Sequence, residues 1–240
     1  MKPMASRDGR GVMCKYDVTD PDVEVMADRF YWLGLDLGKA HDYSALAVIQ
    51  RQVWESRARC GGCFDFHRWE FRGLVRVERI QLGTSYPAVV DRVAAVMRAP
   101  ELKGRCRVVV DATGVGAPVV DLIDLQRLPR MAVTLTGSDG STIKGDNAQV
   151  GKVLLVSALA AALQGDDLAV APGAPGIDQL QTELAELRRK VSAAGRVSMA
   201  AAPGEYDDLV LAVSLANFFA GWNPMKPGFR STPLPMMGRG

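Results

Sequence analysis

Apolar and polar residues in the first third of the chain alternate in patterns that predict β-strands. Two apolar runs, at 31–37 and 45–53, are separated by a short polar turn, so we expect them to form a β-hairpin. From 64 to 80, apolar and charged residues follow each other with a period of two, which predicts a third strand with one face toward water. The N-terminal side of the fold is therefore expected to be an antiparallel sheet.

The rest of the chain alternates between strand and helix patterns. Short, nearly continuous apolar runs at 106–110 and 131–135 predict parallel strands that are buried on both faces. Apolar residues at helical spacing predict helices at 87–97, 118–128, 148–164, 177–191 and 208–220. This order predicts an α/β fold: a mixed sheet with an antiparallel hairpin side, parallel strands, and helices on its faces.

The two ends of the chain lack these patterns. Residues 1–28 show no sustained periodicity and are expected to be a leader or linker, and 222–240, rich in Pro, Gly and Met, is expected to be a flexible tail. Between them we expect one folded domain at 29–221. The chain has 240 residues, 48% of them hydrophobic and 23% charged, which fits a soluble domain with a sizeable core and argues against wholesale disorder.

Composition and charge narrow the setting further. No apolar stretch reaches the roughly 18 residues that a membrane-spanning helix needs, and the N-terminus lacks the apolar core of a secretory signal, so a cytosolic protein is expected. The formal net charge of +2 neither demands nor excludes a polyanionic partner. Basic residues nevertheless gather in two regions, at 57–79 and 188–196.

Two carboxylates stand where a core strand ends. Asp36 interrupts the apolar run 33–37, and Asp111 follows the apolar run 108–110 before a glycine-rich turn. A lone carboxylate in a core strand is destabilising unless it is hydrogen-bonded, paired or metal-bound. Alternatively, Asp36 caps the adjacent turn and Asp111 caps the next helix.

A pair of acids, Asp207 and Asp208, precedes the almost wholly apolar helix pattern at 208–220. Capping of that helix would explain them without any further role. We expect them instead to meet Asp36 and Asp111 at one edge of the sheet, where ligands of such folds collect. Like charges gathered there repel each other unless divalent cations lie between them, and Mg²⁺ and Mn²⁺ prefer carboxylate oxygens. Two such ions can cleave a phosphodiester bond by activating water and stabilising the leaving oxygen.

Four segments resemble, in order and spacing, the nuclease domain of tailed-phage terminase large subunits: GLDLGKAHDYSALAVI, VVVDATGVGAPVVDLI, GKVLLVSALAAAL and EYDDLVLAVSLA. The resemblance extends over residues 31–220 and implies a ribonuclease H-like fold. It implies an endonuclease that cleaves double-stranded DNA with two divalent cations, Mg²⁺ or Mn²⁺. It also implies catalytic and metal-binding roles for Asp36, Asp111 and Asp208, with Asp207 in support.

The chain departs from that family in two respects. Some members carry a further acid one turn into the last helix, where this chain has Leu211. A complete terminase has an ATPase domain, but no Gly-x-x-x-x-Gly-Lys-Ser/Thr motif occurs in this sequence, so ATP hydrolysis is not expected. The resemblance implies a separate packaging ATPase domain or subunit, the small terminase and the portal protein as partners, in the cytoplasm of an infected bacterium.

Several basic residues are candidate DNA contacts. Lys39 and Lys152 belong to the motifs that carry the acids, and the basic strand contributes Arg68, Arg72 and Arg76, which could follow a phosphate backbone. Solvated lysines and arginines on a strand face would produce the same pattern.

A zinc site is a weaker possibility. Cys60, Cys63 and His67 have the spacing of half such a site, with Cys14 or Cys106 as a further ligand. A tight Gly-Gly hairpin turn with incidental thiols is the favoured explanation.

Two other functions remain open at this point. Asp36-Leu-Gly-Lys and Asp111-Ala-Thr-Gly resemble the phosphate-binding turns of actin-like ATP-binding proteins, although two such domains need roughly 300 residues or more. A non-catalytic DNA-binding or capsid-docking module, in which the acids only cap turns and helices, is the other alternative. Metal-dependent DNA cleavage, ATP binding and metal-independent DNA binding distinguish the three.

Overall fold

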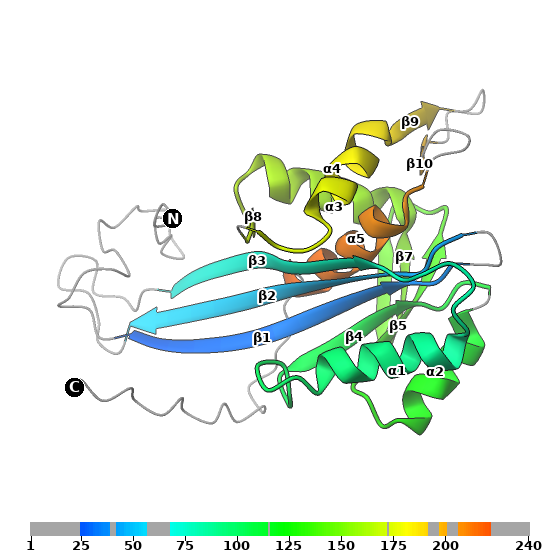
Figure 1. Ribbon diagram of the computed structural model, residues 1–240. Helices are drawn as coiled ribbons and strands as arrows, with labels where there is room; N and C mark the ends of the chain where they lie inside the picture. Colours follow the sequence, from blue (N-terminus) through cyan, green and yellow to red (C-terminus); the bar gives the residue numbers. More distant parts are fainter. Residues whose placement is uncertain are drawn as a thin grey trace.

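The computed structural model describes residues 25–38, 42–56, 68–114, 116–171, 173–191, 197–200 and 206–221. They form a mixed sheet of eight strands in the order β6-β7-β5-β4-β1-β2-β3-β8, with helices against both faces (Figure 1). A separate two-stranded sheet pairs β9 with β10. The expected tail at 222–240 and most of the expected leader at 1–28 lie outside the described residues.

Three long strands make the antiparallel side of the sheet: β1 (Val25–Asp36), β2 (Ala45–Ser56) and β3 (Arg68–Arg79). Antiparallel pairing of β1 with β2 and of β2 with β3 confirms the expected hairpin and third strand. β1 begins at Val25 rather than Tyr31, because its backbone pairing with β2 continues through a stretch without a clear apolar pattern.

A bulge in β3 changes which side chains face which side of the sheet. Leu74 and Arg76 pair with consecutive residues of β2, so Val75 between them has no partner there. An extra residue of this kind reverses the alternation of side chains beyond it. Leu74 and Val77 therefore pack into the same core, whereas Val75 packs into the core on the other face.

The parallel side consists of β4 (Cys106–Asp111), β5 (Arg130–Thr136) and β7 (Asn147–Gly151), all parallel to β1. The strands expected at 106–110 and 131–135 are confirmed. At the sheet edges lie β6 (Ser141–Lys144), antiparallel to β7, and β8 (Leu168–Val170), parallel to β3. The sequence reasoning missed both edge strands, which are too short to show a period.

Helices α1 (Tyr86–Met97) and α2 (Gly116–Leu125) lie on one face of the sheet, as Figure 1 shows. The other face carries α3 (Lys152–Gln164), α4 (Ile177–Glu186) and α5 (Asp208–Gly221). Among the described residues, no helix combines the length and the apolar character that crossing a membrane requires.

Three of the helix predictions have wrong bounds. The helix expected at 118–128 lies at Gly116–Leu125. The helix expected at 148–164 begins only at Lys152, because Ala148 and Val150 point inward while Gln149 is exposed, which is the period of the strand β7. The helix expected at 177–191 ends at Glu186, since the next residue has extended backbone and β9 (Arg188–Val191) follows, paired with β10 (Val197–Ala200).

Helix α5 is the centre of one of the two hydrophobic cores and contacts β1, β2, β3 and β4. Nearly all of its residues are buried, which explains why its sequence is apolar on every side. It approaches β1 closely at Gly34, where a Cβ atom would stand only 1.9 Å from the backbone oxygen of Ala212. A residue without a side chain at position 34 thus sets the distance between α5 and the sheet.

Replacing Gly34 with alanine should push α5 away from the sheet. We expect the free energy of unfolding, measured by urea titration, to fall by about 3 kcal/mol, as in overpacked cores. Gly137→Ala is the matched control, because nothing lies within 4 Å of a Cβ at that position; it should change stability by less than about 0.5 kcal/mol. Equal unfolding midpoints for the two variants would contradict this account.

Candidate active site

The sheet brings Asp36 and Asp111 together. β1 and β4 are parallel neighbours, and Leu35 pairs with Val110, so the next residue of each strand lies at the same level of the sheet edge. Adjacent strands are about 4.8 Å apart. Asp36 is only 7% exposed, and the charge of Asp111 is one of the causes that raise its pKa. The two acids therefore lie close enough for the charge of one to affect the ionisation of the other.

The N-terminus of α5 adds two more acids to this edge. The backbone oxygen of Asp207 accepts the N–H of Leu211 at 2.9 Å, so the helix begins at Asp208. Asp36, Asp42, Asp207 and Asp208 line one pocket of about 270 Å³. The expected cluster of acids at the sheet edge is thus present in the fold, and its catalytic role stays a prediction.

Burial raises the pKa of each of the three principal acids. For Asp36 the pKa lies well above its ordinary value, first through burial and then through the charges of Asp111, Asp208 and Asp207. Burial also raises the pKa of Asp111, although hydrogen bonds from Thr113 lower it in part. The pKa of Asp208 rises to about 7, through burial and next through the nearby Glu183. Without a cation, the cluster resists full ionisation.

Lys152 lies next to the acids. It is the first residue of α3, and its Nζ donates to Oδ2 of Asp207 at 2.8 Å. Its charge lowers the pKa of both Asp36 and Asp111. Lys152 was expected near the acids, and the fold places it there; its role as a phosphate contact stays a prediction.

The donor atoms suit a hard divalent cation. Oδ2 of Asp208 is buried and has no hydrogen-bond partner, and such an atom is destabilising unless something else satisfies it. Within the described ranges, however, no group of three or more His, Cys, Asp or Glu side chains is close enough to hold a metal ion as the side chains now lie. Mg²⁺ usually keeps several waters and completes its coordination with one or two carboxylates and substrate phosphates rather than with protein ligands alone.

Sequence reasoning missed one acid of this region, Glu183 in α4. It is 2% exposed, and its Oε2 accepts the N–H of Val210 in the first turn of α5 at 3.1 Å. The sequence does hold a signal for it: Glu183 falls on the apolar stripe of α4, three residues after the buried Leu180. A charge on the buried face of a helix indicates a specific partner.

The arginines of β3 do not form a single track. Arg72 is directed toward α5, where its Nη1 donates to Oδ1 of Asn217 at 2.8 Å. Beyond the bulge, Arg76 pairs with Glu78 at 2.5 Å, and Glu78 in turn binds Arg92 of α1 on the opposite face. Lys39 and the side chain of Arg68 lie outside the described residues.

The possible zinc ligands Cys14, Cys60, Cys63 and His67 also lie outside the described part of the chain. Cys106 is buried in the core beneath α1 and α2, and burial raises the pKa of its thiol to about 12. A thiol with this pKa is a poor metal ligand and a poor nucleophile, since the thiolate is the reactive form.

Comparison with known proteins gives matches among solved structures. No protein-family model and no curated protein matches the sequence. The nuclease of the large terminase from thermophilic phage G20c is 24% identical with a TM-score of 0.56, covering 79% of this chain and 81% of that one. The same nuclease with bound magnesium is 23% identical with a TM-score of 0.54, covering 80% and 82%. The large terminase nuclease domain of Thermus phage P74-26 is 23% identical with a TM-score of 0.51, covering 78% of each chain.

These matches concern the fold. The mixed sheet with helices on both faces is the fold of terminase nuclease domains, which confirms the ribonuclease H-like architecture expected from the sequence. The similarity extends over about four fifths of the chain.

The buried acids predict an unusual pH dependence of stability in EDTA. Raised pKa values mean that the folded protein binds more protons than the unfolded chain between about pH 4 and pH 7. The stabilisation from these protons is present at low pH and is lost as the pH rises through the pKa of Asp208, about 7. Asp208→Asn should therefore have a higher Tm than wild type at about pH 8 but not at about pH 4. Each kcal/mol gained in the free energy of unfolding should raise the Tm by roughly 2–4 °C.

Asp121→Asn, at an exposed position of α2, is the control and should leave the difference from wild type independent of pH. A Tm difference for Asp208→Asn that is equally independent of pH would show that Asp208 ionises normally in the folded protein.

Proposed function

We propose that this protein is a metal-dependent endonuclease that cleaves double-stranded DNA as the nuclease part of a phage DNA-packaging terminase. The observation that carries the proposal is the gathering of four carboxylates, Asp36, Asp111, Asp207 and Asp208, at one edge of the sheet. The fold of the chain, which is that of phage terminase nucleases, supports the reaction class.

In this proposal, Asp36, Asp111 and Asp208 hold two divalent cations, Mg²⁺ or Mn²⁺, and Asp207 supports them. Carboxylate oxygens are the donors that such cations prefer. When bound, the ions supply an activated water for attack on phosphorus and stabilise the leaving oxygen. The chain's part is to keep the acids together: two adjacent parallel strands fix Asp36 and Asp111, and the buried helix α5 fixes Asp208.

Lys152 has two tasks in this proposal. In the absence of DNA its ammonium group neutralises Asp207 and lowers the pKa of Asp36 and Asp111. When DNA is bound, the same group attracts a phosphate next to the acids, as a correctly spaced positive charge does. Lys39, which follows the end of β1 by three residues in the sequence, stays a predicted contact.

The wider expectations belong to the same proposal. The packaging ATPase would be another domain or subunit, and the small terminase and the portal protein would be further partners, in the cytoplasm of an infected bacterium. The folded nuclease unit would extend over 29–221, with β1 starting slightly earlier, between a leader and a tail.

Asp36→Asn and Asp111→Asn should each abolish cleavage of plasmid DNA in the presence of Mn²⁺ or Mg²⁺. The change removes a charged ligand at nearly constant volume, so we expect the rate to fall by about a hundredfold or more with little change in DNA binding. Cleavage is measured as conversion of supercoiled to nicked and linear plasmid, with EDTA as the metal-free control.

Asp91→Asn, an exposed acid of α1 outside the cluster, should cleave at the wild-type rate. A wild-type rate for Asp36→Asn or Asp111→Asn would make the assignment of the site wrong. ATP binding by the wild type without cleavage would favour the actin-like alternative, and metal-independent DNA binding without cleavage would favour a docking module.

DNA affinity should fall steeply with salt, because phosphate contacts release counterions. Arg76 is better suited than Arg72 to such a contact. The Arg72 side chain is 15% exposed and bonded to Asn217, whereas the Arg76 side chain is 36% exposed. We expect Arg76→Met to reduce the slope of log affinity against log salt by about 1 and Arg72→Met to leave it unchanged. The reverse result would place DNA on the α5 face of β3.

A further inference from the structure

A partly buried ion pair lies beside the candidate acids and joins three elements. Nη2 of Arg79, the last residue of β3, donates to Oε1 of Glu183 in α4. The other oxygen of Glu183 accepts the N–H of Val210, 3.1 Å away, in the first turn of α5. The pair thus connects β3 and α4 to the helix turn that carries Asp208.

Two tyrosines hold the Arg79 guanidinium in place. Its central carbon lies 4.8 Å from the ring centroid of Tyr43 and 5.0 Å from that of Tyr206. The two rings contact each other edge to face, with centroids 5.2 Å apart. Tyr206 directly precedes Asp207, and Tyr43 lies two residues before the start of β2, so Arg79 contacts two segments that are distant in sequence, one of which leads into α5.

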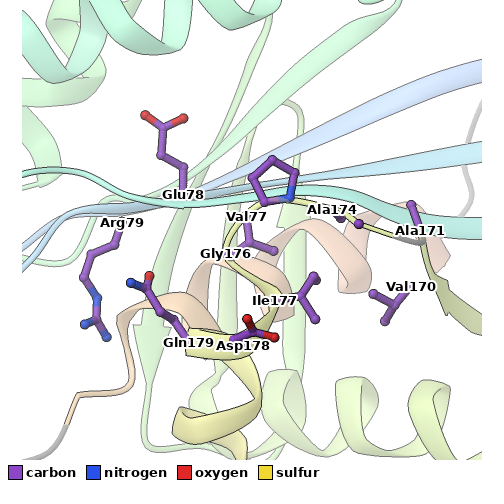
Figure 2. A pocket seen from close by; sticks show the side chains of 12 residues that line it. Val77, Glu78, Arg79, Val170, Ala171, Ala174, Gly176, Ile177, Asp178 and Gln179 are labelled. Carbon is purple, nitrogen blue, oxygen red and sulfur yellow. The ribbon is translucent and has the colours of Figure 1, made fainter.

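Arg79 reaches this position because of the strand on which it lies. Figure 2 shows Glu78 and Arg79 on opposite sides of β3, with Arg79 beside a pocket of about 780 Å³ between β3 and α4. Glu78 instead binds Arg92 of α1, an exposed pair that leaves the acids untouched.

Neither member of the Arg79–Glu183 pair is suited to binding a cation directly. Both oxygens of Glu183 already have partners, and Arg79 has the same sign of charge as a metal ion. The N–H groups in the first turn of a helix are commonly capped by a Ser, Asp or Asn side chain next to them in the sequence. Capping alone therefore does not require an acid from another helix. A cap supplied by α4 fixes where α5 lies relative to the rest of the fold.

We propose that Arg79 and Glu183 are positioning residues, which fix the first turn of α5 so that Asp208 meets Asp36 and Asp111 at the spacing that a divalent cation needs. This inference rests on the proposed function. Residues that orient metal ligands affect metal affinity strongly, by about 10- to 100-fold when mutated.

The test is a Mn²⁺ titration followed by electron paramagnetic resonance, together with the Mn²⁺ concentration for half-maximal plasmid cleavage. We expect Arg79→Met and Glu183→Ala to weaken Mn²⁺ binding about tenfold or more. Glu183→Gln should weaken it less, because one amide oxygen can still accept either the Val210 N–H or the Arg79 Nη2 bond. Arg92→Met, which removes an exposed arginine of the neighbouring ion pair, should bind Mn²⁺ like the wild type. All measurements are made well below the Tm of each variant, determined in parallel.

Arg79→Met separates positioning from simple electrostatics, because the two give opposite results. Removing a nearby positive charge by itself strengthens binding of a cation, whereas loss of the support for α5 weakens it. Unchanged or tighter Mn²⁺ binding by folded Arg79→Met would overturn the inference, and so would a change confined to the KM for DNA. A wild-type protein that binds Mn²⁺ but cleaves no DNA would overturn the proposed function instead, and the Mn²⁺ affinities would still test the positioning role.

Discussion

The close contact between α5 and β1 at Gly34 determines much of the rest of the structure. Because position 34 has no side chain, the helix backbone packs directly on the strand, with a Cβ there only 1.9 Å from the Ala212 oxygen. The helix is buried along nearly its whole length, so its direction follows from packing rather than from charge. Its N-terminus then lies at the edge where β1 and β4 end, and the Asp207–Asp208 pair comes to Asp36 and Asp111 as a result.

This arrangement places several carboxylates near one another in a buried site, where their ionised form is unfavourable. Burial raises the pKa values of Asp36, Asp111 and Asp208, and neighbouring acids raise those of Asp36 and Asp208 further. The folded protein without a cation is therefore less stable than the same fold with neutral residues there. Lys152 and Arg79 provide positive charge nearby, which moderates the repulsion without removing it. Strain of this kind concentrates at functional sites, where a ligand relieves it.

The sequence was sufficient to predict the parts of the fold that follow from the spacing of apolar residues and from the order of the strands. Asp36 and Asp111 could be placed together because each ends an apolar strand, and parallel pairing brings such ends to one edge. The start of α3 could not be predicted, since Ala148 and Val150 suit a helix as well as a strand and only the pairing with β5 decides between them. Glu183 was missed because its partners, Val210 and Arg79, are distant in sequence. The fold confirms the architecture, while the roles of the acids stay predictions.

The bulge at Val75 shows how one unpaired residue can redistribute charge. Arg72 and Arg76 have the same parity in the sequence, yet the shift in phase sends their side chains to opposite faces of the sheet. The same shift brings Arg79 to the face of α4 and α5. A strand without the bulge would present Arg72 and Arg76 on one face and Arg79 on the other. One additional residue, a rise of about 3.3 Å along the strand, therefore distributes the arginines of β3 over both faces of the sheet. On one of these faces the arginine contacts reach the acids.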